Sequence, residues 1–99
     1  MTGTLAIIGP GTLGCSLGDW AARKGFQVRL AGRNLEHARR GRERIEKQWQ
    51  EGVRKGRITP GAVAEAQLRL QAAATWEEAL DGAQIVIEAL PEAAAVKAP

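Results

Sequence analysis

The sequence is short of several residue types: among its 99 residues it has one cysteine, one histidine and no tyrosine. One cysteine cannot form an internal disulfide, which agrees with a reducing compartment. No apolar run approaches the roughly 20 residues that a membrane-spanning helix needs. The N-terminus lacks the basic region and the long apolar core of a secretory signal. These absences predict a cytoplasmic protein that does not bind a membrane.

The rest of the composition is typical of a soluble globular protein. Hydrophobic residues make up 44% of the sequence and charged residues 25%, which is too apolar for a disordered chain. A chain of this size buries about 60–68% of its unfolded surface, enough to fold with little margin. The sequence therefore provides one small domain or part of a larger one.

The net charge is +3, and basic side chains gather between Arg33 and Arg57. The simplest interpretation is the solvated face of one long helix, on which glutamates at helical spacing pair with the cations. A surface that attracts a phosphorylated small molecule is a second interpretation. Nucleic-acid binding is a third, but no recognised motif accompanies the charge, and we expect no nucleic-acid partner.

A glycine-rich turn follows the first apolar run, which covers residues 5–8. The turn reads Gly9-Pro10-Gly11-Thr12-Leu13-Gly14. In a dinucleotide-binding turn the first glycine permits the sharp bend, the second lets the backbone approach a pyrophosphate, and the third lets helix and strand pack closely. The pyrophosphate then lies at the helix N-terminus, where free N–H groups favour negative charge. A purely structural turn is the alternative.

The elements around this turn alternate between strand and helix. Apolar runs predict strands at residues 5–8, 26–31, 68–73 and 85–87. Helical spacing, with caps at Asn34, Thr59 and Thr75 and stops at Gly25, Gly56 and Gly82, predicts helices at residues 13–24, 35–55, 60–67 and 76–81. The order β-α-β-α-α-β-α-β predicts an α/β fold, a Rossmann-type parallel sheet with flanking helices.

The last residues continue the pattern only briefly. Residues 91–97 show helical spacing, and the sequence stops at Pro99. A dinucleotide fold needs two mononucleotide-binding halves, and these 99 residues supply the first half and the fourth strand. We therefore expect residues 1–99 to be the N-terminal part of a truncated dinucleotide-binding domain.

Two signatures resemble a known family. The first is Ile7-Ile8-Gly9-Pro10-Gly11-Thr12-Leu13-Gly14, and the second is Asp81-Gly82-Ala83-Gln84-Ile85-Val86-Ile87-Glu88-Ala89-Leu90-Pro91-Glu92. Together with a long charged helix before the third strand, they are similar to the NAD-binding N-terminal domain of the 3-hydroxyacyl-CoA dehydrogenase family, which includes the lambda-crystallin proteins. The resemblance covers essentially the whole sequence.

The resemblance implies a set of binding residues. Gly9 to Gly14 would hold the pyrophosphate, while Glu92 and Lys97 would lie near the nicotinamide-side ribose. The alternative for Glu92 is a carboxylate at the start of the last helix, and for Lys97 a solvated helix residue. The family's coenzyme A contact at the end of the long helix falls on Lys55, although Gln48 replaces a serine used nearby.

One position departs from the family pattern. NAD-specific members carry an acidic residue at the end of the second strand, which accepts hydrogen bonds from the adenosine ribose. That position is Gly32 in this sequence. Without this carboxylate, the chain lacks the hydrogen-bond acceptor that selects NAD. It also lacks the negative charge that would repel a 2′-phosphate. The adjacent Arg33 can pair with such a phosphate. The cofactor is therefore NAD or NADP.

The resemblance implies oxidation of a 3-hydroxyacyl-CoA, part of fatty-acid metabolism, by a histidine base oriented by a glutamate. Those motifs would follow Pro99, so no catalytic residue and no metal ligand are expected.

We interpret His37 as a surface helix residue, Cys15 as a packing residue, and Trp20, Trp49 and Trp76 as core or interface residues. The leading hypothesis is that the chain is the cofactor-binding portion of an oxidoreductase and is inactive by itself. A non-catalytic dinucleotide-binding module and an inactive remnant are the alternatives, and an exposed sheet edge predicts a homo-oligomer.

Overall fold

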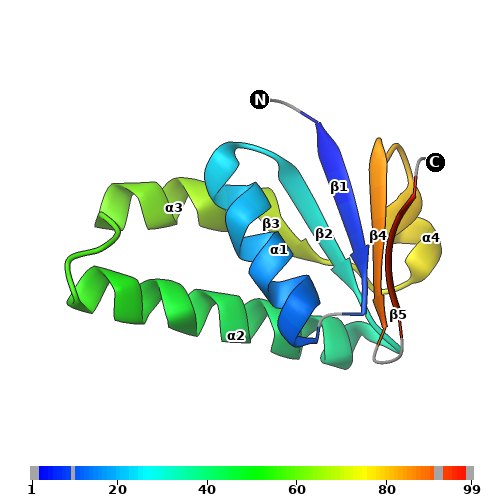
Figure 1. The fold of residues 1–99 in the computed structure, drawn as a ribbon, viewed down its shortest axis with the longest axis horizontal. Helices are drawn as coiled ribbons and strands as arrows, with labels where there is room; N and C mark the ends of the chain where they lie inside the picture. Colours follow the sequence, from blue (N-terminus) through cyan, green and yellow to red (C-terminus); the bar gives the residue numbers. More distant parts are fainter. Residues whose placement is uncertain (1–2, 10, 91–92, 98–99) are drawn as a thin grey trace.

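The computed structural model describes residues 3–9, 11–90 and 93–97. Its centre is a five-stranded sheet in the order β3-β2-β1-β4-β5 (Figure 1). The strands are β1 (Thr4–Ile8), β2 (Gln27–Ala31), β3 (Leu70–Ala72), β4 (Ile85–Leu90) and β5 (Ala93–Lys97). The helices are α1 (Thr12–Lys24), α2 (Leu35–Arg54), α3 (Pro60–Arg69) and α4 (Trp76–Leu80). The first four strands are parallel to one another, which confirms the predicted fold class.

Strand β1, in the middle of the sheet, is buried on both faces, and its successive residues point to opposite sides. Leu5 and Ile7 of β1 belong to the larger apolar cluster, which contains buried residues of α1, α2 and α3. Ala6 and Ile8 belong to the smaller cluster on the other face, with Ala79 of α4. This two-sided burial explains why the strand reads as a continuous apolar run instead of an alternating one.

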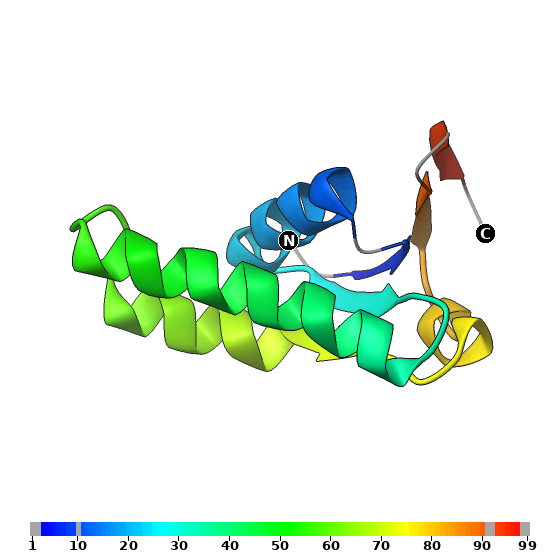
Figure 2. The ribbon, with the colours of Figure 1, turned by 90° about the horizontal axis from the view of Figure 1, so that it is seen from below.

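Helices α2 and α3 form an arm that extends beyond the sheet (Figures 1 and 2). Both helices begin where the sequence placed their caps. The Asn34 side chain accepts a hydrogen bond from the His37 amide at 2.8 Å, and the Thr59 hydroxyl accepts one from the Ala62 amide at 3.1 Å. These bonds satisfy amides that the first helical turn leaves without a partner.

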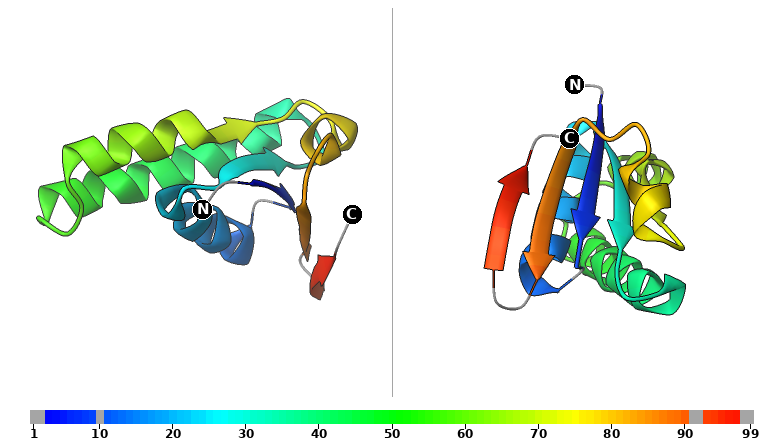
Figure 3. Two further views of the ribbon diagram at one scale, coloured as in Figure 1. Left: turned by 90° about the horizontal axis from the view of Figure 1, so that it is seen from above. Right: turned by 90° about the vertical axis from the view of Figure 1, so that its right-hand side faces the viewer.

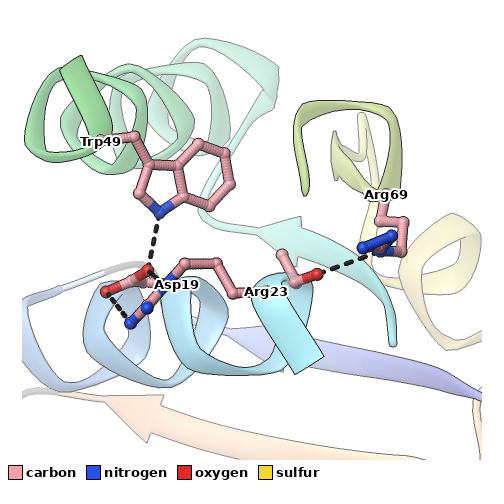
Figure 4. A network of polar contacts seen from close by, with 5 residues as sticks. Asp19, Arg23, Trp49 and Arg69 are labelled. Atoms are coloured by element: carbon pink, nitrogen blue, oxygen red, sulfur yellow. Dashed lines mark hydrogen bonds and ion pairs between the residues drawn. The ribbon is translucent and has the colours of Figure 1, made fainter. Parts of the chain in front are cut away.

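A polar network joins α1 to the arm (Figure 4). Trp49 of α2 is 1% exposed, and its indole Nε1 donates to Asp19 Oδ1 at 2.6 Å. Arg23 Nε donates to the same carboxylate at 2.7 Å. Arg69 at the end of α3 donates from Nε to the Ala22 carbonyl at 3.0 Å. The buried indole is therefore hydrogen-bonded as well as packed, and α1 is tied to both helices of the arm.

The helix expected for residues 91–97 is wrong. Residues Ala93–Lys97 form strand β5, which pairs antiparallel with β4 (Figure 3). Two physical reasons favour the strand. A helix this short is unstable by itself. Without β5, the side of β4 that faces away from β1 would present a row of unpaired backbone groups. The last strand therefore covers the sheet edge that the sequence interpretation left open.

Replacing Trp49 with alanine should lower the free energy of unfolding by about 3–5 kcal/mol, because the change opens a cavity and removes the hydrogen bond to Asp19. Trp20 provides the control. It is 51% exposed and stacks on Phe26, so Trp20→Ala should cost no more than about 1.5 kcal/mol. Urea denaturation followed by circular dichroism measures both. Equal losses for the two variants would contradict the packing described for Trp49.

Candidate functional site

Strands β1, β2 and β4 end at the same side of the sheet, which we call the carboxyl edge (Figure 3). Ile8, the last residue of β1, lies in register with Ala31 of β2 and with Glu88 of β4. From β1 the chain proceeds first to β2 on one side and later to β4 on the other. In open α/β sheets the point where the strand order reverses in this way is where ligands bind.

The β1–α1 turn lies at this point. Gly9 has φ of +93°, and its amide donates to the Ala31 carbonyl at 2.8 Å, which joins the turn to the end of β2. The Gly11 amide donates to the Gly9 carbonyl at 2.9 Å. Helix α1 begins at Thr12, with no acidic residue in its first turn and no side-chain hydrogen bond at its N-cap. The N–H groups of that turn therefore have no protein side chain as a cap among the described residues.

The three glycines of the turn meet different surroundings. Gly9 needs its positive φ, which other residues rarely adopt. A Cβ atom at Gly14 would lie 2.5 Å from the Gly9 carbonyl oxygen and 3.2 Å from Ile7 Cγ2, so helix and strand are in close contact there. A Cβ atom at Gly11 would meet nothing within 4 Å. The fold thus requires glycine at the first and third positions but not at the second.

Gly14 tests the close packing of α1 on the turn. Gly14→Ala should destabilise the fold by about 1–3 kcal/mol, since either the helix or the Gly9 carbonyl must move. The control is Gly61→Ala in α3, where a Cβ meets nothing within 4 Å. That change should stabilise the fold by about 0.4–1 kcal/mol through the unfolded chain. Urea titration distinguishes the two signs, and a Gly14 variant as stable as the parent would refute the contact.

A second cluster lies at the end of β2. Gly32 is buried, and an ideal Cβ built there would be 2.4 Å from His37 Nδ1 and 3.0 Å from His37 Cβ. The Arg33 amide donates to His37 Nδ1 at 3.1 Å. On another side, Trp76 Nε1 donates to the Gly32 carbonyl at 2.9 Å. The side-chain position that the sequence left empty at Gly32 is therefore filled by the ring of His37.

The interpretation of His37 as a simple surface residue missed this contact, because the ring is half-buried against Gly32. A signal was present in the sequence. His37 is three residues after the cap Asn34, the position from which a side chain reaches back to an amide before the helix in a capping box. Histidine can accept that hydrogen bond through Nδ1, as glutamate does through its carboxylate.

Several predicted site residues lie apart from this edge. Lys55 is the C-cap of α2 and forms an ion pair with Glu51 at 3.6 Å. It follows a helix of 20 residues, which separates it from the β2–α2 turn by about 30 Å. Lys97 lies in register with Val86 at the start of β4, away from the carboxyl edge. Pro10 and Glu92 lie outside the described residues.

Cys15 is buried at 2% exposure, and its thiol donates to the Gly41 carbonyl at 3.6 Å. Burial raises the pKa of the Cys15 thiol more than the nearby Arg44 guanidinium lowers it. The thiol is therefore protonated at neutral pH, which excludes a reactive thiolate. Its surroundings agree with a packing residue between α1 and α2.

Two clefts lie elsewhere. One of about 320 Å³ is bordered by Arg23, Arg57 and Arg69 near the start of α3, and one of about 220 Å³ is bordered by Arg29, Glu78 and Asp81. The residues that border these two clefts do not include the glycine turn. In the described part of the chain, no group of three or more acidic, histidine or cysteine residues is placed to hold a metal ion. Over the same residues, every helix is too short or too polar to cross a membrane.

Comparison with known proteins agrees with this geometry. A family model for the NAD-binding domain of 3-hydroxyacyl-CoA dehydrogenase matches residues 4–99. The chain is 37% identical over 93 residues to a probable 3-hydroxybutyryl-CoA dehydrogenase of Bacillus subtilis, covering 94% of this chain and 32% of that protein.

Two solved structures extend the likeness. The 3-hydroxybutyryl-CoA dehydrogenase of Escherichia coli matches with a TM-score of 0.84 and 32% identity, over 92% of this chain and 19% of that one. The (S)-3-hydroxybutyryl-CoA dehydrogenase of Ralstonia eutropha matches with a TM-score of 0.83 and 24% identity, over 91% of this chain and 31% of that one, and so supports the fold alone. The chain spans about a third or less of the length of these relatives.

Proposed function

The chain belongs to the 3-hydroxyacyl-CoA dehydrogenase family, as part of its NAD-binding domain, and we propose that its carboxyl edge holds the adenosine and pyrophosphate half of a nicotinamide dinucleotide. Gly11 carries the proposal. It is exposed, and a Cβ atom there meets nothing within 4 Å. A glycine that the fold does not need, at the N-terminus of α1, leaves space for a phosphate to approach the backbone.

The electrostatics of the turn support an anion at this place. The first turn of α1 contains no acidic residue, and Gly11, Thr12 and Leu13 are exposed. The amides at the start of a helix carry partial positive charge and point along its axis. A pyrophosphate would accept hydrogen bonds from them without competition from a capping side chain. Residues of the turn therefore bind and orient the cofactor and take no part in proton transfer.

The proposed reaction is hydride transfer between a 3-hydroxyacyl-CoA type of substrate and the nicotinamide ring, which supplies the hydride acceptor when the cofactor is bound. The printed names of the relatives, 3-hydroxybutyryl-CoA dehydrogenases, support this substrate class. The chain's own histidine is held against Gly32 by the Arg33 amide. We therefore assign cofactor binding to these residues, and turnover to the larger protein of which they are the cofactor half.

Four finer assignments belong to the proposal. Gly32 lacks the carboxylate that selects NAD, so NADP is accepted as well. Lys55, exposed at the far end of α2, contacts coenzyme A, and Glu92 serves the nicotinamide side. Lys97 is not assigned to that side, because it pairs with Val86 at the start of β4, away from the carboxyl edge. Exposed apolar side chains at Leu13, Trp20 and Leu68 favour a homo-oligomer in which copies cover them.

The Gly11→Ala variant tests dinucleotide binding. We expect the affinity for NADH, measured by quenching of tryptophan emission, to fall at least about tenfold, or about 1.4 kcal/mol, because the added methyl blocks the phosphate. The unfolding free energy should change by less than about 1 kcal/mol, the usual range for a helix cap.

Gly61→Ala, which adds the same methyl in α3, is the matched control and should bind NADH like the parent. Equal NADH affinities for the Gly11 variant and the parent would contradict the proposed site. If the parent chain binds no dinucleotide, the inactive-remnant interpretation replaces a cofactor-binding function.

A further inference from the structure

The His37 ring occupies the side-chain position of Gly32, just after β2. In dinucleotide-binding folds an acidic residue at the end of this strand contacts the ribose. We propose that His37 takes over this contact, so that an imidazole N–H donor replaces the acidic acceptor and recognises the 2′-phosphate of NADP. The inference rests on the proposed dinucleotide site and assigns its selectivity to a residue outside the glycine turn.

The first observation is steric. Gly32 is not among the glycines with positive φ, so its backbone conformation is open to other residues. What excludes a side chain is the His37 ring, with Nδ1 at 2.4 Å and Cγ at 2.8 Å from an ideal Cβ. An aspartate at position 32 and a histidine ring at position 37 therefore compete for one space. The ring lies where the acid of an NAD-selective protein would begin.

The second observation concerns the proton on the ring. The Arg33 amide donates to Nδ1 at 3.1 Å, so Nδ1 is the acceptor and the neutral ring carries its hydrogen on Nε2. No described residue forms a hydrogen bond with Nε2 in this structure, and the side chain is half-buried at the protein surface. The ring is thus fixed by one nitrogen and offers a donor with the other.

The third observation is the local charge. Arg33, whose backbone amide contacts the ring, has an exposed side chain, and the N-terminus of α2 adds partial positive charge. Glu36, the one acidic residue in the first turn of α2, forms an ion pair with Arg40 at 3.6 Å. The group that approaches from α4 is the indole of Trp76, which donates its hydrogen to the Gly32 carbonyl and is uncharged. These surroundings favour a dianionic phosphate over a neutral hydroxyl.

Adenosine fragments test the assignment without the nicotinamide side of the site. We would measure binding of 2′,5′-ADP and 5′-AMP to the 99-residue chain by titration calorimetry. The parent should bind 2′,5′-ADP about tenfold more tightly than 5′-AMP, and His37→Ala should reduce that ratio to about twofold. Binding of 5′-AMP should stay unchanged.

Arg39→Ala is the matched control, because Arg39 is an exposed basic residue of the same helix and should leave the ratio as in the parent. The double variant Gly32→Asp with His37→Ala removes the ring and restores the acid, and its preference should reverse toward 5′-AMP. Circular dichroism verifies that each variant is folded.

The single histidine allows a direct spectroscopic check. In a long-range proton–nitrogen spectrum, the unprotonated signal should belong to Nδ1, and 2′,5′-ADP should shift the Nε2 signal more than 5′-AMP does. An unchanged ligand ratio in His37→Ala, or a proton on Nδ1, overturns the inference while the proposed function stands. Failure of the parent to bind either fragment overturns the proposed function itself.

Discussion

The carboxyl edge depends on how closely α1 approaches β1 at Gly14. The position of an absent Cβ, 2.5 Å from the Gly9 carbonyl oxygen and 3.2 Å from Ile7 Cγ2, shows that no larger residue fits without movement. This approach brings the first amides of α1 over the end of β1. Beside this contact, Gly9 has a positive φ, and its amide donates to the Ala31 carbonyl. The geometry of the β1–α1 turn is therefore a consequence of packing.

The rest of the chain holds that approach in place. Asp19 accepts hydrogen bonds from Trp49 and Arg23, and the Cys15 thiol reaches the Gly41 carbonyl. The Trp49 and Cys15 contacts join α1 to α2, on the same sheet face as Ile7. The long arm thus supports the site indirectly, because it fixes the helix whose N-terminus the ligand would meet. Its far end, with Lys55, extends about 30 Å away from the β2–α2 turn.

Most of the fold followed from local signals in the sequence. Caps at Asn34, Thr59 and Thr75 placed three helix starts, and their side chains accept the expected amide hydrogen bonds. Strand β5 could not be predicted in this way. Its alanine-rich segment has helical propensity, and its pairing with β4 is a tertiary interaction that satisfies an otherwise open edge. Local propensity is a weak guide wherever a free strand edge is nearby.

The cluster at Gly32 illustrates a limit of motif-based interpretation. A motif assigns one residue type to each position. By that rule, the glycine at position 32 is interpreted as a missing acidic side chain at the end of β2. In the structure this space is occupied, because the ring of His37 lies where the side chain is missing and accepts a hydrogen bond from the Arg33 amide. The two positions are five residues apart in the sequence, and a side chain at position 32 would occupy the same space as the His37 ring. The surroundings of Gly32 are consequently understood only together with the third residue of the following helix, because the ring of that residue occupies the space that a side chain at position 32 would need.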